Sequence, residues 1–340
     1  MPATPHGAPT TIDVDGIAVR LTSPDKPVFP GVTKRTVLDY YLAVGRRMLE
    51  QVADRPTALE RWPEGVTDEA EHFYQKHLPK SVPSYVTGID VRFPSGRPGT
   101  LLNPDSRAAI GWAVQMGTVT FHAWPVHTPI VDKPDQLRID LDPPDGRDFS
   151  DVVRVAEECR EVLAQWDWPA YVKTSGGRGL HVFVPIRAEH SFIEVRHAAI
   201  AVGREVERRL PDLVTMSWWK EERGDRIFVD FNQNAQDRVM ASAYSLRPRP
   251  KAPVSMPLRW ADLEGVNPLD FTIRTVPHLV QTFPDPWAGI REAAVDLAPA
   301  LEAWDRDVAQ GLPELPYPPD FPKMPGEPPR VQPSRARPTS

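Results

Sequence analysis

The sequence predicts a mixed α/β (α+β) fold, with a core of mixed sheets flanked by helices, and three observations support this prediction. Short apolar segments that suit strands recur along the 340 residues, and several pairs of them are separated only by tight turns. Two longer segments, near 33–52 and 192–210, carry apolar residues at helical spacing. A doubly wound parallel sheet needs a helix between successive strands, so strands joined by turns favour mixed sheets.

Local sequence patterns predict the secondary-structure elements of the first 62 residues. Residues 12–21 alternate apolar and polar side chains around Asp15-Gly16, which predicts a hairpin with a type I′ turn. Thr33 is a suitable N-cap for a helix through about residue 52, because its hydroxyl can accept from an amide of the first turn. Residues 57–62 then suit a strand.

The remaining elements are predicted by the same patterns. Strands are expected at 86–93, 100–102, 119–124, 137–142, 170–174, 180–185, 226–230 and 240–245. Helices are expected from Asp105 to about 115, from Asp148 or Ser150 to about 166, and at 192–210, 268–271, 276–283 and 286–309.

The predicted organisation has one folded region between two irregular ends. Residues 1–10 are rich in Pro and Ala and are predicted to be disordered. Residues 311–340 are Pro-rich with few apolar side chains and are predicted to be extended or disordered. Residues 11–310 form the folded region, in two lobes that meet near 115–135. The 40 prolines favour short strands and irregular connections, because proline interrupts both helices and sheet ladders.

Composition limits the classes of protein that remain. Cys159 is the only cysteine, which excludes an intramolecular disulfide and a cysteine-based zinc site. No secretory leader and no apolar run of membrane-spanning length is visible, so we expect a cytoplasmic protein that is not associated with a membrane. The net charge of −6 argues against indiscriminate nucleic-acid binding, but local basic patches can still bind a polyanion.

Two acids at the end of one predicted strand are the strongest chemical motif. Asp140 and Asp142 are two residues apart, so they share one face of the strand, and Pro143 ends it. Neighbouring carboxylates repel each other unless a cation lies between them, and hard divalent ions favour such oxygen ligands. The alternative interpretation is a solvated turn rich in Asp and Pro.

A third acid, Asp230, ends another short apolar strand. A pair of carboxylates with a third from a distant strand is what a two-metal phosphoryl or nucleotidyl transfer site requires. Asp140, Asp142 and Asp230 are therefore candidate ligands for two divalent cations, manganese or magnesium. Asp also ends strands without any metal, and that interpretation stays open for Asp230 alone.

A glycine-rich loop, residues 174–181, is the second motif. Its glycines allow backbone amides to approach an anion, and Arg178 can direct two hydrogen bonds at a phosphate. Ser175 and His181 can each donate one more. The loop lacks the spacing of a Walker motif, and the alternative is a tight hairpin turn.

Other candidates gather around these motifs. His122 lies between aromatic residues on a predicted strand, where a packed core histidine is the alternative. Phe73 and Tyr74, close to Lys76, can stack on bases, although core packing is the default for aromatic side chains. Basic clusters occur around Lys26 and Lys34, before Asp230, and after residue 246, and several such clusters beside metal ligands suit a polyanion.

In combination these motifs resemble the archaeo-eukaryotic primase superfamily, and most closely the polymerase domain of bacterial DNA ligase D and its stand-alone relatives. The resemblance covers residues 21–263 and depends on the order and approximate spacing of the motifs. Its carriers are Ser23-Pro24-Asp25-Lys26, Thr33-Lys34, Tyr40-Tyr41, Phe73-Tyr74-Gln75-Lys76, Asp140-Leu141-Asp142-Pro143, residues 175–181, Phe228-Val229-Asp230, Gln233-Asn234 and residues 243–247.

The resemblance implies metal-dependent, template-directed addition of nucleotides, with a preference for ribonucleotides, at gaps or 5′-phosphorylated ends of DNA under repair. Asp140, Asp142 and Asp230 are the implied catalytic metal ligands. The implied contacts of the nucleoside triphosphate are His122, Ser175, Arg178, His181, Arg223, Gln233 and Arg247. The implied DNA contacts are Lys26 and Lys34 at a 5′-phosphate, Phe73 and Tyr74 on the template, and Lys76 beside them.

Three departures from the family pattern are visible. Arg178 and Glu60 stand where lysine is usual, and the loop between Lys26 and Lys34 is short. The resemblance also implies a monomer associated with the nucleoid, with a separate ligase and the Ku end-binding protein as candidate protein partners, in excision repair or end joining. Two other functions stay open, a metal-dependent nuclease or phosphatase and a non-catalytic DNA-end-binding protein.

Overall fold

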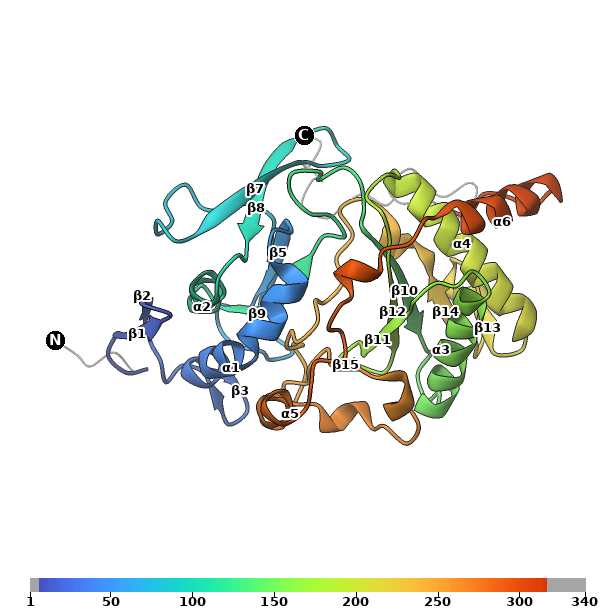
Figure 1. Cartoon of the computed structure of the whole chain (residues 1–340). Coiled ribbons are helices and arrows are strands. Elements are labelled where there is room, and N and C mark those ends of the chain that lie inside the picture. The colour runs from blue at the N-terminus through green and yellow to red at the C-terminus, as the bar shows by residue number, and fades with distance from the viewer. Residues whose placement is uncertain (1–5, 317–340) are drawn as a thin grey trace, which may run out of the picture.

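The computed structural model describes residues 6–316 and contains two main sheets (Figure 1). The first sheet has five strands in the order β6-β5-β8-β7, with β9 paired to β5, and the second has six in the order β13-β14-β10-β12-β11-β15. Strands are mostly antiparallel, β13 and β14 being a parallel pair, and helices lie against both sheets. The predicted mixed α+β class is confirmed.

The first sheet is built from strands in the N-terminal part of the chain. They are β5 (Thr57–Arg61), β6 (Phe73–Gln75), β7 (Thr87–Arg92), β8 (Pro98–Asn103) and β9 (Thr118–Ala123). The helices α1 (Lys34–Val52) and α2 (Arg107–Gln115) pack together beside it, and two small hairpins, β1 (Thr10–Val14) with β2 (Ile17–Leu21) and β3 (Pro27–Phe29) with β4 (Val32–Thr33), precede them.

The second sheet uses later strands. They are β10 (Gln136–Asp142), β11 (Tyr171–Thr174), β12 (Leu180–Pro185), β13 (Val214–Thr215), β14 (Ile227–Asp230) and β15 (Pro257–Leu258). The helices are α3 (Phe149–Ala164), α4 (Phe192–Arg209), α5 (Val276–Thr282) and α6 (Ala298–Ala309), and the short 3₁₀ helices are η1 (Lys220–Glu222), η2 (Phe231–Asn234), η3 (Trp260–Asp262), η4 (Pro268–Asp270) and η5 (Arg291–Ala293). Helices α3 and α4 contact the sheet and each other, and α6 packs on α4.

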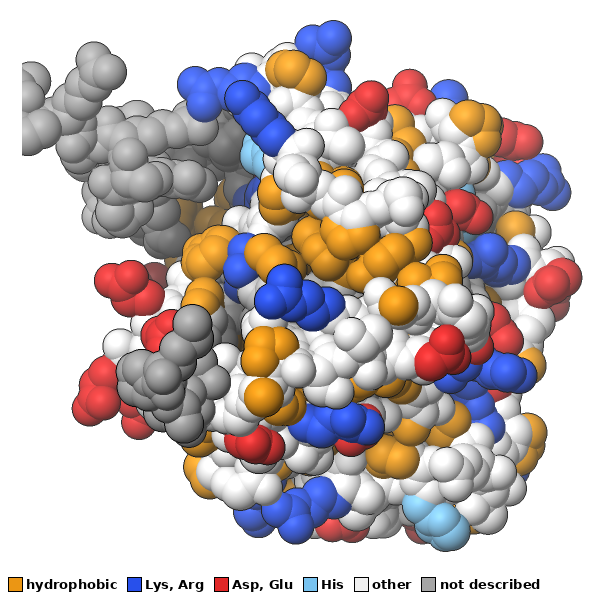
Figure 2. Space-filling view, turned by 90° about the vertical axis from the view of Figure 1, so that its left-hand side faces the viewer, with side chains coloured by type: hydrophobic (Ala, Val, Ile, Leu, Met, Phe, Trp, Pro, Cys, Tyr) orange, Lys and Arg blue, Asp and Glu red, His pale blue; other side chains and the backbone are white. Residues whose placement is uncertain are grey.

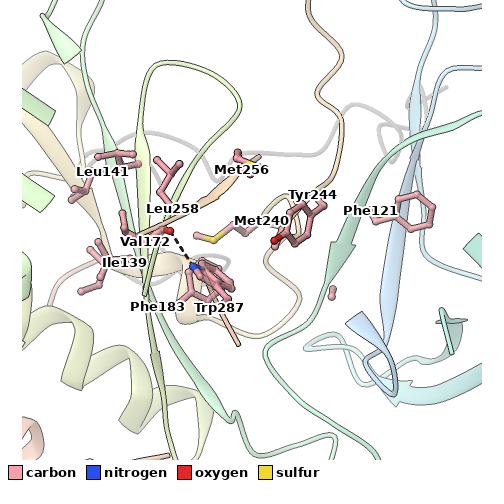
Figure 3. Packing of buried hydrophobic residues seen from close by; sticks show 14 of the residues in the cluster. Phe121, Ile139, Leu141, Val172, Phe183, Met240, Tyr244, Met256, Leu258 and Trp287 are labelled. Carbon is pink, nitrogen blue, oxygen red and sulfur yellow. Dashed lines mark hydrogen bonds between the residues drawn. The ribbon is translucent and has the colours of Figure 1, made fainter. Parts of the chain in front are cut away.

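One apolar core joins the two sheets. The Trp287 indole lies 4.9 Å from the Phe183 ring and donates a hydrogen bond to the Val172 carbonyl at 3.0 Å. Figure 3 shows Tyr244 between this group and Phe121 of β9, and all of them belong to one buried cluster. Because the cluster is continuous, residues on the two sheets hold fixed positions relative to one another.

Local signals in the sequence located most element boundaries. Thr33 caps α1 by accepting a hydrogen bond from the Thr36 amide at 3.2 Å, as predicted. Asp15 and Gly16 have φ of 54° and 83°, as a type I′ turn requires. The predicted cap of α2 is wrong, because Ser106 caps it and the Asp105 carboxylate instead accepts from the Thr87 hydroxyl at 2.8 Å.

Two further predictions are wrong for tertiary reasons. Residues 240–245 form no strand, since Tyr244 has φ of +65° and the segment binds β9 partly through the Ser242 and Ser245 hydroxyls. The helix expected at 286–309 begins only at Ala298. Val295 before it is extended and bridges to Ile186, beyond the end of β12, which takes that segment out of the helix.

The two chain ends are only partly described. The His6 carbonyl accepts from the Asp25 amide, and Glu314 forms ion pairs with Arg196 at 2.7 Å and His197 at 2.6 Å. The predicted disorder of residues 1–5 and 317–340 lies outside the described residues. Among residues 6–316, no helix combines the length and apolar character needed to cross a bilayer.

Candidate active site

A row of four polar residues crosses the second sheet. Asp140 on β10 lies directly opposite Asp230 on β14 and opposite His181 on β12. His181 in turn lies opposite Lys173 on β11. Directly opposed residues of antiparallel strands share a face, so Asp230, Asp140, His181 and Lys173 form one continuous row. The structure thus brings together two of the predicted metal ligands with one predicted triphosphate contact.

The Gln233 side chain bridges the two paired acids. Its Nε2 donates to Asp140 Oδ2 at 3.3 Å and to Asp230 Oδ2 at 3.0 Å, while the Asn232 amide donates to Asp230 Oδ1 at 2.8 Å. Burial, and for Asp230 also the charge of Asp140, raise the pKa of Asp140 to about 6 and that of Asp230 to about 7. The pair therefore retains a proton at a pH where single exposed acids have lost theirs.

Asp142, the third predicted ligand, is exposed at the end of β10. Partial burial and the charge of Asp140 raise the pKa of its carboxyl as well. Across residues 6–316, no three His, Cys, Asp or Glu side chains are grouped closely enough to hold a metal ion as they stand. The chemistry of the donors nevertheless fits a hard divalent ion, because the Gln233 amide donor occupies the place between two carboxylates that a cation favours.

A cavity of about 220 Å³ opens beside the acids. Nine of the predicted site residues line it, namely Tyr74, His122, Asp140, Asp142, Ser175, Arg178, His181, Gln233 and Arg247. Three polar atoms of its lining are buried without a hydrogen-bond partner: His122 Nδ1, Gln233 Oε1 and Arg247 Nε. Buried polar groups are nearly always paired, so these three atoms mark a place where a polar ligand fits.

Cationic side chains also line this cavity. Arg247 lies close enough to Asp140 and Glu60 to lower the pKa of both carboxyls, although burial is the larger influence on each. Arg178 is half-exposed and pairs with Asp145, and Arg249 also lines the cavity. A cavity lined by both carboxylates and guanidinium groups suits a phosphate that bridges to a metal ion.

The amides of the glycine-rich loop are less available to an anion than the sequence suggested. The Ser175 hydroxyl oxygen accepts from the Gly177 and Gly179 amides, both at 3.1 Å, so these amides are already satisfied. A Cβ on Gly179 would lie 2.3 Å from the Leu141 carbonyl oxygen, so this glycine permits the loop to pack against β10. The loop therefore shapes the cavity, and the hydroxyl hydrogen of Ser175 remains available to donate.

His122 is held in the cavity lining by Glu60. The Glu60 carboxylate, 4% exposed, accepts from His122 Nε2 at 3.1 Å and from the Trp62 indole at 3.2 Å. Burial alone raises a carboxyl pKa, but the hydrogen bond from His122, the charge of Arg247 and the hydrogen bond from Trp62 bring the pKa of Glu60 below its usual value. Glu60 therefore orients an imidazole and does not lie at an exposed DNA-binding surface.

Replacing Glu60 by glutamine is expected to lower the free energy of unfolding by about 1–3 kcal/mol, because one of two buried donors then faces an NH₂ group. Thermal or denaturant unfolding measures this loss. Glu50→Gln on the exposed face of α1 is the matched control and should change little. Equal stability of Glu60→Gln and the control would show that the hydrogen bonds of Glu60 contribute nothing.

Two predicted contacts lie at the edge of the site. Arg223 stacks over the Phe228 ring at 3.6 Å and donates to two main-chain carbonyls, with its charge near Asp142 and Asp230. Lys76 instead forms an ion pair with Asp237 at 2.7 Å, so its charge is already compensated.

Lys26 and Lys34 line a separate cavity of about 260 Å³, together with Arg61. Lys34 donates to the Thr22 carbonyl at 3.0 Å, and Lys26 pairs with Glu64 at 2.8 Å. Burial, and then the charges of Lys26 and Arg61, lower the pKa of Lys34 to about 8. Three cations around one hollow create repulsion that a bound anion would relieve.

Phe73 and Tyr74 are among the most exposed large apolar side chains, at 45% and 43%. Phe73 lies under the Arg61 guanidinium at 5.0 Å, and Tyr74 lies 5.3 Å from the His122 ring, so the pair extends from one cavity to the other. Exposed aromatic rings between two cationic cavities suit stacking on bases.

Surface charge elsewhere does not single out one binding face. Figure 2, which views the side of the molecule at the left of Figure 1, shows Lys and Arg side chains mixed with Asp and Glu around a band of apolar side chains. On this face an anion would therefore bind in a local hollow and not across a broad basic surface.

Sequence reasoning missed one member of the row, Lys173, which is fully buried. The available signal was a lysine within an apolar strand just before the glycine loop. Only the order and register of the strands show that Lys173 lies on the same face of the sheet as the acids, and a single sequence does not provide them.

The fold and the site define a class. Mixed sheets with paired strand-end acids beside a cationic cavity are typical of nucleotidyltransferases that use metal ions. Residues 33–287 match the family model described as "LigD, primase-polymerase domain". The chain belongs to this family of primase-polymerase nucleotidyltransferases.

Individual relatives agree with this assignment. The chain is 33% identical over 251 residues to the multifunctional non-homologous end joining protein LigD of Mycolicibacterium smegmatis, covering 72% of this chain and 32% of that protein. It is 27% identical over 262 residues to the bifunctional LigD of Bacillus subtilis, covering 76% and 42%. The chain thus spans less than half the length of these curated relatives.

A solved structure gives the same result for the fold. The polymerase domain of Mycobacterium tuberculosis ligase D in complex with DNA superposes with a TM-score of 0.74 and 29% identity. The match covers 81% of this chain and 98% of that one.

Proposed function

We propose that this protein adds nucleotides to the 3′-hydroxyl of a primer in DNA repair, at short gaps or 5′-phosphorylated ends, under the direction of a template. The observation that carries the proposal is the row of Asp230, Asp140 and His181 beside a cavity that contains three unpartnered polar atoms. The relatives, which include a non-homologous end joining protein and a polymerase domain in complex with DNA, support the same substrate class.

Asp140, Asp142 and Asp230 would hold the divalent cations, manganese or magnesium. Such ions lower the pKa of an attacking hydroxyl and stabilise charge on the transferring phosphorus. Arg247, Arg178 and Ser175 would orient the triphosphate in the cavity. Tyr74 and Phe73 would stack on the template, and the hollow of Lys26 and Lys34 would take a 5′-phosphate across the gap.

A preference for ribonucleotides is part of the proposal. His122 Nδ1 is buried, lacks a hydrogen-bond partner and lies in the cavity lining. With Nε2 donating to the Glu60 carboxylate, Nδ1 is an acceptor when the imidazole is neutral, and a sugar hydroxyl is a suitable donor. Burial lowers the pKa of His122, which favours that neutral form.

The test is extension of a primer across a one-nucleotide gap whose downstream strand carries either a 5′-phosphate or a 5′-hydroxyl. We expect extension of the phosphorylated gap to be faster, and ribonucleotides to be used faster than deoxyribonucleotides. Lys34→Ala should remove the difference between the two gaps, whereas the exposed control Lys80→Ala should retain it. Equal rates on both gaps in the wild-type protein would contradict the 5′-phosphate site.

The same assay distinguishes the competing functions. A metal-dependent nuclease would shorten the primer, and a phosphatase would remove the 5′-phosphate without extending the primer. A non-catalytic end-binding protein would bind the gap and leave it unchanged.

A further inference from the structure

A second polar cavity, of about 300 Å³, lies at the end of β10 away from the catalytic acids. Gln136, the first residue of β10, and Pro185, the last residue of β12, belong to its lining. Gln136 and Asp140 are four residues apart on an extended strand, which is about 13 Å. This cavity, which we call the distal cavity, shares no lining residue with the active-site cavity. Whatever it binds is therefore held by a separate set of side chains.

A buried ion pair forms part of the lining of the distal cavity. The Arg55 side chain is 2% exposed, and its Nη1 and Nη2 donate to the two carboxylate oxygens of Asp135 at 2.6 and 2.9 Å. His127 Nδ1 also contacts this carboxylate. Both oxygens of Asp135 thus have partners, and its charge is compensated by Arg55. The pair joins the segment before β5 to the segment before β10, which is a sufficient structural reason for these particular contacts.

The ion pair leaves two buried nitrogens unexplained. Among the described residues, neither Arg55 Nε nor His127 Nε2 has a hydrogen-bond partner, and neither is accessible to solvent. A guanidinium nitrogen can only donate, whereas His127 Nε2 can take either role. Because buried polar groups are nearly always paired, these two atoms indicate that the distal cavity accommodates a polar ligand.

The other side chains of the lining supply an excess of donors. Arg291, which is exposed, and Gln51, which is 7% exposed, have no side-chain hydrogen bond within residues 6–316. The Gln136 amide oxygen accepts twice from Arg138, which leaves the NH₂ group of Gln136 free. Burial, and then the charge of Arg55, lower the pKa of Arg291, so the two guanidinium groups are close enough to repel each other. An anion would relieve this repulsion.

The negative groups near the distal cavity oppose an anion only weakly. The Asp135 carboxylate is already paired, and the Asp54 carboxylate accepts from the Asn103 amide at 3.5 Å, outside the lining. The carboxyl end of α1 lies close to Gln51, and its partial negative charge acts over a single turn. A neutral polar molecule would satisfy Arg55 Nε but would leave the two guanidinium groups facing each other without a counter-charge.

We propose that the distal cavity is an oxyanion site that takes a phosphate group, either of a free phosphate compound or of the DNA backbone. Arg291 and Arg55 Nε would donate to the phosphate oxygens, and the amides of Gln51 and Gln136 would complete the shell. The site does not depend on the proposed nucleotide addition, because its lining contains none of the residues assigned to that reaction.

The first test is a titration of the metal-free protein with inorganic phosphate, followed by the NMR signal of the Arg55 Nε–H group. We expect a saturable shift that chloride at equal ionic strength does not produce. Arg291→Ala should weaken phosphate binding by roughly 10- to 100-fold, the equivalent of one hydrogen bond to a charged group. Gln51→Met, which preserves length and removes the amide, should weaken it less.

Two controls restrict this result to the distal cavity. Arg154→Ala removes the same charge from an exposed position on α3 and should bind phosphate like the wild-type protein. Arg178→Ala alters the active-site cavity and should leave the Arg55 shift unchanged. Equal phosphate affinity of Arg291→Ala and Arg154→Ala would overturn the assignment of Arg291 and with it the proposed site.

The second test identifies the source of the phosphate with a gapped DNA duplex. If the backbone of DNA occupies the site, DNA should shift the Arg55 signal, and Arg291→Ala should reduce the slope of log affinity against log salt by about one relative to Arg154→Ala. If a free phosphate compound occupies it, the two variants should bind DNA equally, and inorganic phosphate should still shift the Arg55 signal in the DNA complex. An Arg55 signal that responds to neither phosphate nor DNA overturns the proposal, whether or not the protein extends primers.

Discussion

Replacing Asp140 and Asp142 together by alanine is expected to reduce nucleotide addition by roughly 10³-fold or more, because the cations that these acids would hold stabilise the transition state, and the loss of one electrostatic group of that kind commonly costs about 10²–10³. The two acids share one face of β10, and Asp140 lies at the centre of the polar row. DNA binding should remain measurable, since Lys26 and Lys34 line a separate cavity. Single-turnover extension and a gel-shift titration measure the two properties.

The matched control removes two exposed acids elsewhere, in Asp132→Ala with Asp212→Ala. It changes the net charge equally, so any general effect on DNA affinity appears in both proteins. Extension by the Asp140 and Asp142 variant at the rate of the control would refute the assignment of the acids.

Replacing Asp230 by asparagine is expected to stabilise the metal-free protein while abolishing nucleotide addition. The wild-type protein holds the half-buried Asp230 and Asp140 opposite each other, and the loss of solvent and the charge of Asp140 raise the pKa of Asp230 to about 7. The amide removes one charge at constant shape. Gln233 can turn its unpartnered Oε1 toward the new NH₂ group, so the hydrogen bonds are retained.

The sign of the pH dependence follows from the raised pKa. The ordinary Asp value is 3.8, so between that value and about 7 the folded protein binds a proton that the unfolded chain has released. The contribution of Asp230 to stability is therefore lost as the pH rises through about 7. The gain in the free energy of unfolding from Asp230→Asn should be small near pH 3.8 and reach about 1–3 kcal/mol above neutral pH. One pKa unit corresponds to about 1.4 kcal/mol.

Chemical denaturation in the presence of a chelator, at several pH values, measures this difference. Added manganese should reverse the order, because the cation stabilises the wild-type carboxylates and not the amide. An advantage of Asp230→Asn that is constant with pH, or that survives saturating manganese, would contradict charge repulsion as its cause.

The sequence predicted the parts of the site that depend on local pattern. Alternation along β10 placed Asp140 and Asp142 on one face, and the acid after residues 227–229 identified Asp230 as a third candidate. The structure adds which strands are neighbours. The register that sets Asp230 and His181 opposite Asp140 depends on long-range pairing, which periodicity alone does not determine.

The features that the sequence did not predict also depend on long-range contacts. Lys173 becomes part of the row only because β11 pairs with β12, and Glu60 reaches His122 only because β5 pairs with β9. Residues 240–245 read as a strand by composition, but the positive φ of Tyr244 and the serine contacts to β9 are tertiary features. The intrinsic strand propensity of a segment does not determine its conformation where tertiary contacts favour another one.

The most direct test of the central claim is single-turnover addition of one complementary nucleoside triphosphate to a gapped DNA in manganese. The wild-type protein should lengthen the primer by a template-matched nucleotide, and neither Asp230→Asn nor a chelated wild-type reaction should do so. Primer shortening, or addition that survives chelation or the loss of Asp230, would contradict a metal-dependent nucleotidyl transfer site at the row of Asp230, Asp140 and His181.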